Sequence, residues 1–66
     1  MNDNENLRVK IKALQVEHSD LDHAIQAILR DTTPDMLRIQ RLKKRKLLLK
    51  DQIERLMSML LPDIIA

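Results

Sequence analysis

Apolar residues recur in alternating steps of three and four through both halves of the chain, and this spacing limits the fold more than any other feature. Such steps place every member on one stripe of an α-helix and form a heptad repeat with apolar a and d positions. The pattern predicts two amphipathic helices, each with a single seam. In the first half the series is Leu7, Ile11, Leu14, Leu21, Ile25 and Ile28, and in the second half Ile39, Leu42, Leu49, Ile53, Leu56 and Leu60.

A turn signal separates the two series. Thr33 is expected to cap the second helix, with Pro34 at its first position, where a missing N–H is harmless. Capping by Thr32, with Asp35 nearby, is the alternative. We expect one domain over residues 1–66, made of a helix over about 4–30, a turn over 31–34, a helix over about 34–61 and an apolar tail over 62–66. So short a connection makes the two helices antiparallel neighbours.

The two seams fit one register. If facing residues have numbers that sum to 67, each a residue of one helix meets a d residue of the other, from Ile28 and Ile39 at the turn to Leu7 and Leu60 at the open end. Asp22 is then expected to face Lys43. The predicted fold class is therefore all-α, an antiparallel two-helix hairpin that resembles a coiled coil and self-associates.

Two polar residues, His18 and Lys46, occupy seam positions. A histidine there is a candidate metal ligand or pH switch, and a buried lysine is a candidate nucleophile. Three convergent metal ligands are lacking, since His23 points away from His18. We therefore predict no metal, no cofactor and no catalytic residue. The two residues are expected to form a polar layer that sets the packing geometry, with the Lys46 ammonium reaching Glu17, Asp20 or Asp22.

Apolar residues remain after the seam is filled, and a lone hairpin cannot bury them. Val9, Ala13 and Val16 form a second stripe on the outward side of the first helix. Exposed apolar patches of this kind mark interfaces. We expect self-association or docking on a larger protein through Val9, Val16, Leu47, Leu48, Met57, Met59 and Leu61.

Charge is distributed unevenly. Residues 1–31 carry six acids and four bases, whereas residues 32–66 carry four acids and eight bases. A basic run in the second helix suggests an alternative function in nucleic-acid association. The chain has no aromatic residue to stack on bases, so such binding would be weak, salt-sensitive and neutral to sequence. The residues of this alternative are Arg38, Arg41, Lys43, Lys44, Arg45 and Lys50.

Several classes of protein do not fit the composition. The 66 residues include no glycine for a phosphate-binding loop and no cysteine for a disulfide or thiolate metal site. No nucleophile has a base partner at a useful spacing, so we expect no enzymatic activity. No stretch approaches the roughly 18 apolar residues of a membrane span. The segment 1–6 lacks the features of a signal peptide, and we expect a cytoplasmic protein.

Two segments resemble a known family. They are Glu17-His18-x-x-Leu21-Asp22-x-x-Ile25 in the first helix and the run from Leu42 to Ile53, LKKRKLLLKDQI, in the second. With the proline-containing turn between them, they resemble the YdcH-like family of small bacterial proteins, which carry a domain of unknown function. The resemblance covers about Leu7 to Met57. It implies a cytosolic helical hairpin and no particular activity.

Overall fold

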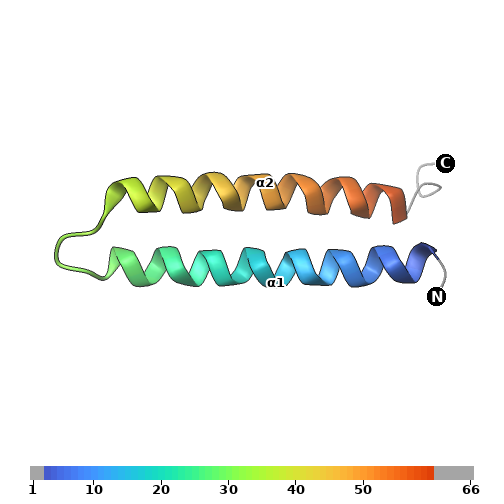
Figure 1. The fold of residues 1–66 in the computed structure, drawn as a ribbon, viewed down its shortest axis with the longest axis horizontal. Helices are drawn as coiled ribbons and strands as arrows, with labels where there is room; N and C mark the ends of the chain where they lie inside the picture. The colour runs from blue at the N-terminus through green and yellow to red at the C-terminus, as the bar shows by residue number, and fades with distance from the viewer. Residues whose placement is uncertain (1–2, 61–66) are drawn as a thin grey trace.

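The structure is a computed structural model, and it describes residues 3–60. Helix α1 spans Asp3–Leu29 and helix α2 spans Met36–Leu60, with 27 and 25 residues respectively. The two helices run antiparallel, side by side along their whole lengths, and residues 30–35 join them at one end (Figure 1). The described residues contain no strand. The predicted all-α hairpin is confirmed.

Helix α1 ends where the turn begins, within a residue of the expected position. The N–H of Arg30 donates to the carbonyl of Ala27 at 3.3 Å, and the N–H of Asp31 donates to that of Ile28 at 3.1 Å. These bonds reach back only three residues, so the last turn is tightened and two carbonyls at the helix end find partners.

Helix α2 begins at Met36, two residues later than the sequence predicts, and Asp35 rather than Thr33 caps it. The N–H of Arg38 donates to Oδ1 of Asp35 at 3.1 Å, and the N–H of Ile39 donates to the Asp35 carbonyl at 3.1 Å. Both bonds are those of an N-cap residue. The prediction of a Thr33 cap was wrong because the Asp35 carboxylate, which also carries charge, suits the positive end of the helix better than a threonine hydroxyl. Pro34 lies outside the helix, before its cap.

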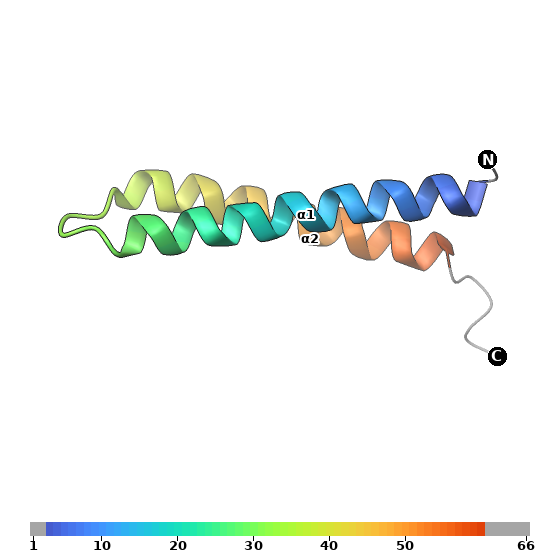
Figure 2. The same cartoon turned by 90° about the horizontal axis from the view of Figure 1, so that it is seen from below.

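The core is a single line of residues between the helices. Ile11, Ile25, Ile39 and Leu49 are buried, with exposed fractions of 7%, 2%, 2% and 0%. Every other a and d position from Leu7 to Leu60 is half-buried, including those of His18 and Lys46. Viewed at 90° to the first picture, the helices cross at a shallow angle near their middle, as helices of a coiled coil do (Figure 2). The seam therefore follows the heptad pattern along its full length.

Candidate interaction surfaces

The polar layer of the seam is completed by an ion pair. Nζ of Lys46 donates to Oδ1 of Asp22 at 2.7 Å, and the two side chains are 33% and 48% exposed. This hydrogen bond, followed by the charge of the ammonium, holds the pKa of Asp22 below its usual value. Asp22 is thus paired with Lys46 rather than with Lys43, and it is one of the three acids expected to receive the Lys46 ammonium. The lysine stem leaves its a position and its ammonium emerges at the edge of the seam, beside the e position of Asp22.

A second ion pair crosses between the helices on the other side of the seam. Nε and Nη2 of Arg45 both donate to Oε2 of Glu17, at 3.1 and 2.8 Å. In both pairs an acid of α1 meets a base of α2. A surface pair of this kind stabilises a fold by no more than about 1 kcal/mol. The two pairs therefore contribute to register and alignment more than to stability.

One long face of the hairpin is formed by the e and b positions of both helices, and we call it the lysine face. It carries an open hollow of about 430 Å³ with Ile53 in its floor. The face includes Lys43 at an e position. The hollow has an apolar lining with polar residues of α1 on one side and lysines of α2 on the other: it is lined by Gln15, His18, Lys46, Leu47, Lys50 and Ile53.

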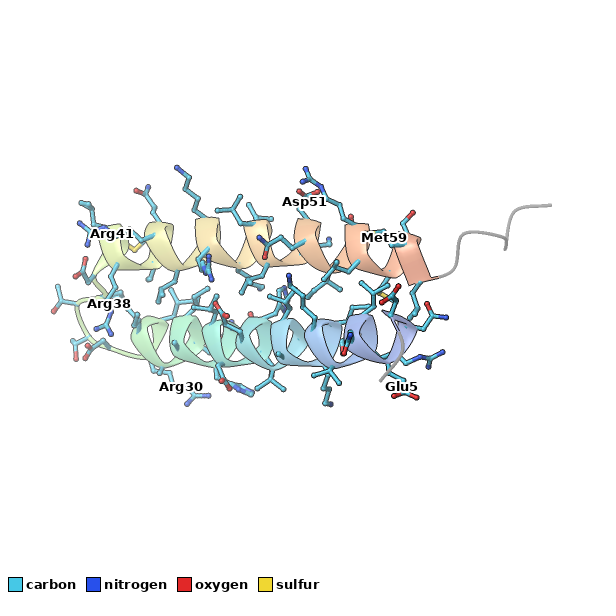
Figure 3. The ribbon with its side chains drawn as sticks, turned by 45° about the vertical axis from the view of Figure 1, so that its right-hand side comes forward. Glu5, Arg30, Arg38, Arg41, Asp51 and Met59 are labelled. Carbon is cyan, nitrogen blue, oxygen red and sulfur yellow. The ribbon has the colours of Figure 1, made fainter. Side chains whose placement is uncertain are left out.

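The opposite long face is formed by the g and c positions, and we call it the arginine face. The four arginines of α2, namely Arg38, Arg41, Arg45 and Arg55, all lie at these positions. Arg45 is paired with Glu17, and Arg55 is paired with Asp51 at 2.9 Å. Arg38 and Arg41 have no ion pair within residues 3–60, and both lie in the half of α2 nearest the turn (Figure 3).

The residues of the predicted nucleic-acid site are therefore not brought together. Arg38, Arg41 and Arg45 lie on the arginine face, Lys43 and Lys50 lie on the lysine face, and Lys44 takes the outward f position. The separation follows from 3.6 residues per helical turn, which spreads an uninterrupted basic run around the helix.

The apolar residues predicted to form an interface are exposed, but they occupy several surfaces. Val9 and Val16, at 60% and 48% exposed, lie on the outward side of α1. Leu47 (67%) and Met57 (43%) belong to the lysine face, and Leu48 (52%) and Met59 (61%) belong to the arginine face. Leu61 and the tail over 62–66 lie outside the described residues.

Three further apolar side chains at the turn were not predicted. Leu29, Met36 and Leu37 are 45%, 59% and 56% exposed, and they flank the connection between the helices. Their positions off the heptad seam are visible in the sequence, so the signal was present. The turn end is therefore a further uncovered apolar surface.

A second open hollow, of about 300 Å³, lies on the arginine face and is lined by Lys10, Leu14, Gln52, Arg55, Leu56 and Met59. Within the described part of the chain, no three histidine, cysteine, aspartate or glutamate side chains are grouped so that they could hold a metal ion. None of the described helices is long and apolar enough to cross a membrane. Surfaces on the outside of a hairpin are thus the features on which a function can be based.

An antiparallel hairpin with one seam and uncovered side chains around it is a small helical module. The family model described as a protein of unknown function (DUF465) matches residues 11–57, and the chain belongs to this family. The resemblance to YdcH-like proteins is consistent with that membership. Comparison with curated proteins found no match. Comparison with solved structures found none either.

Proposed function

We propose that this protein is a non-enzymatic interaction module, a helical hairpin that oligomerises or docks on a larger protein. One observation carries the proposal. Nine large apolar side chains of the described residues are at least 43% exposed, whereas four apolar side chains are buried. Full burial of one such side chain contributes roughly 1.5–3 kcal/mol, so covering even a few of them would stabilise an assembly substantially.

The size of the hairpin supports the same proposal. A domain of about 60 residues buries only about 60% of the surface of its unfolded chain, and its stability is marginal. Small domains without disulfides or metals commonly gain stability by associating. The resemblance to YdcH-like proteins supports a bacterial, cytoplasmic setting for this module.

The experiment has two readouts for the same chain. The concentration dependence of its mass, measured by sedimentation, reports self-association. Proteins recovered in stoichiometric amounts with a tagged copy at native abundance, after nuclease treatment, report docking. We expect at least one of these to be positive. A chain that stays monomeric at high micromolar concentration and recovers no stoichiometric protein contradicts the proposal.

A second candidate function, sequence-neutral association with nucleic acid, is favoured by the arginine face. Arginine binds phosphate with two donors in a fixed geometry, and Arg38 and Arg41 have no competing ion pair within residues 3–60. The two lie three residues apart, so they are neighbours on the helix surface. The candidate site is thus narrower than the basic run predicted from the sequence.

Matched variants test this second candidate. Arg38→Gln with Arg41→Gln removes two charges from the arginine face, and Lys43→Gln with Lys50→Gln removes two from the lysine face. If the arginine face binds a DNA or RNA duplex, the first variant weakens binding. It also lowers the slope of the logarithm of the binding constant against the logarithm of the salt concentration, by about one for each phosphate that is no longer neutralised. The second variant retains most of the binding. Equal effects of the two variants, or no binding at about 50 mM salt, contradict a role for this face.

A further inference from the structure

We infer that the outward stripe of α1 binds the same stripe of a second copy, giving a reversible antiparallel dimer. The inference rests on the proposed interaction function and names its partner. We define the α1 stripe as Val9, Ala13 and Val16 with the polar residues that flank them, Asn6, Lys10, Glu17 and Asp20.

The apolar row of the α1 stripe faces away from α2, whereas Lys10 and Glu17 lie at g positions between this row and α2. Val9 and Val16 take f positions and Ala13 a c position, on the side opposite the seam. The side chains of Glu5 and Arg30, near the two ends of this helix, point away from α2 in Figure 3. Val9 and Val16 are 60% and 48% exposed, and Ala13 is exposed as well. Residues 3–60 therefore leave this apolar row largely exposed.

The stripe is complementary to itself when two copies pack antiparallel. If facing residues have numbers that sum to about 26, Ala13 lies against Ala13 of the second copy, on the two-fold axis. Val9 then packs beside Val16 of the second copy, and the symmetry repeats this contact. Alanine at the crossing point lets the two helix backbones approach closely. A two-fold interface uses the same surface of both copies, so the assembly stops at a dimer.

Charges in the α1 stripe match in the same register. Lys10 of each copy lies level with Glu17 of the other, and Asn6 lies level with Asp20 of the other. Both Arg45 donors use Oε2 of Glu17, which leaves Oε1 for the lysine of the second copy. A parallel arrangement would instead place lysine beside lysine and glutamate beside glutamate. The charges therefore select the antiparallel dimer.

The balance of charge also favours α1 over α2 as the contact between two copies. Residues 3–29 carry five acids and three bases, whereas residues 36–60 carry two acids and eight bases. Two copies of α2 would repel each other strongly. The stripe from Asn6 to Asp20 is about 22 Å long, so it covers well under half of the roughly 800 Å² that each partner buries in a standard interface. The dimer is therefore reversible and forms at micromolar or higher concentration.

Lys12 provides an independent check, because the two copies of this residue lie near each other on the other flank of the contact. Like charges at that position weaken the dimer. Lys12→Gln removes the repulsion and should tighten the dimer several-fold. A Lys12→Gln variant that dimerises less well than the parent contradicts the register.

The chain has no cysteine, so single cysteines can map the contact directly. Ala13→Cys places two thiols at the two-fold axis, where the Cα separation suits a disulfide. We expect mild oxidation to link most of this variant into dimers. Val16→Cys is the matched control: it should link poorly with itself but readily with a Val9→Cys chain. Helix content measured by circular dichroism checks that each variant is folded.

A charge exchange tests the pairing without cross-linking. Lys10→Glu alone and Glu17→Lys alone each replace two attractive pairs by two repulsive ones, and each should weaken the homodimer about tenfold. An equal mixture should form the heterodimer, in which both pairs are attractive again. Because Glu17→Lys also breaks the pair with Arg45, Arg45→Gln serves as a control and should leave the dimer intact.

The outcomes separate this inference from the proposed function. A dimer in which Ala13→Cys links no better than Val16→Cys overturns the α1 contact but leaves an interaction module. A chain that is monomeric at high micromolar concentration overturns the dimer, and the stoichiometric capture described above then decides the proposed function separately.

Discussion

The two helices of the hairpin share one inner surface and differ in their outer surfaces. Along the seam they are equivalent: each supplies two buried residues, Ile11 and Ile25 from α1 and Ile39 and Leu49 from α2. Outside the seam, α1 presents a row of small apolar residues flanked by charges of both signs, whereas α2 presents arginines on one side and lysines on the other.

This difference shows which residues specify the fold and which remain for function. The buried residues all lie in the seam, so we expect substitutions elsewhere to cost less stability than substitutions in the seam. The two ion pairs that cross the seam follow the same division, since each joins an acid of α1 to a base of α2. Opposite charges on the two helices favour their pairing within the chain. The α1 stripe and the arginine face are then the surfaces that we propose for contacts with other molecules.

The largest effect is expected for residues of the shared seam. Leu49→Ala removes the most buried side chain and should cost about 2–5 kcal/mol, enough to unfold most of so small a domain. Leu48→Ala, one residue earlier and 52% exposed, is the control and should change stability by less than about 0.5 kcal/mol. Urea or thermal unfolding followed by circular dichroism measures both. Similar losses for the two variants would show that the seam is not the core.

An intermediate effect is expected at the start of α2. Asp35→Ala removes the carboxylate that accepts the N–H of Arg38 and should cost about 1 kcal/mol. Thr33→Ala should have little effect, because the Asp35 carboxylate already accepts the N–H of Arg38. The same unfolding experiment compares the two. A larger loss of stability for Thr33→Ala than for Asp35→Ala would show that Thr33 is the N-cap, as the sequence predicts.

The smallest effect is expected at the Asp22–Lys46 pair and depends on pH. The pKa of Asp22 is lower in the folded chain than the ordinary value of 3.8 that applies to the unfolded chain. Its contribution to stability is therefore complete above that value and is lost as the pH falls through the folded pKa. Carboxyl titration by NMR should place the pKa of Asp22 below the usual value, and Lys46→Met should raise it. An unchanged pKa in Lys46→Met would show that the ion pair does not form.

Much of the fold could be predicted because a heptad pattern is local information. The spacing of apolar residues identified both helices, the seam and its direction, and the proline marked the turn. The start of α2 was misplaced because Thr33 and Asp35 are both good caps, and only the backbone path decides which carboxylate or hydroxyl reaches the N–H of Arg38. The acid that receives the Lys46 ammonium was left open among Glu17, Asp20 and Asp22, because the sequence gives the position of Lys46 but not the path of its long side chain; the structure selects Asp22.

By itself, the sequence determined that this protein is a two-helix hairpin with a polar layer at His18 and Lys46 and with more apolar residues than one seam can bury. Only the tertiary structure decided how the remaining side chains are distributed. Helical geometry spreads the basic run over the arginine face, the lysine face and the outward f position. Arg45 of this run and the seam residue Lys46 are paired with acids of α1, and the apolar row of the α1 stripe stays exposed. These outcomes depend on the rotation of each helix about its own axis, which is fixed when the two seams pack together.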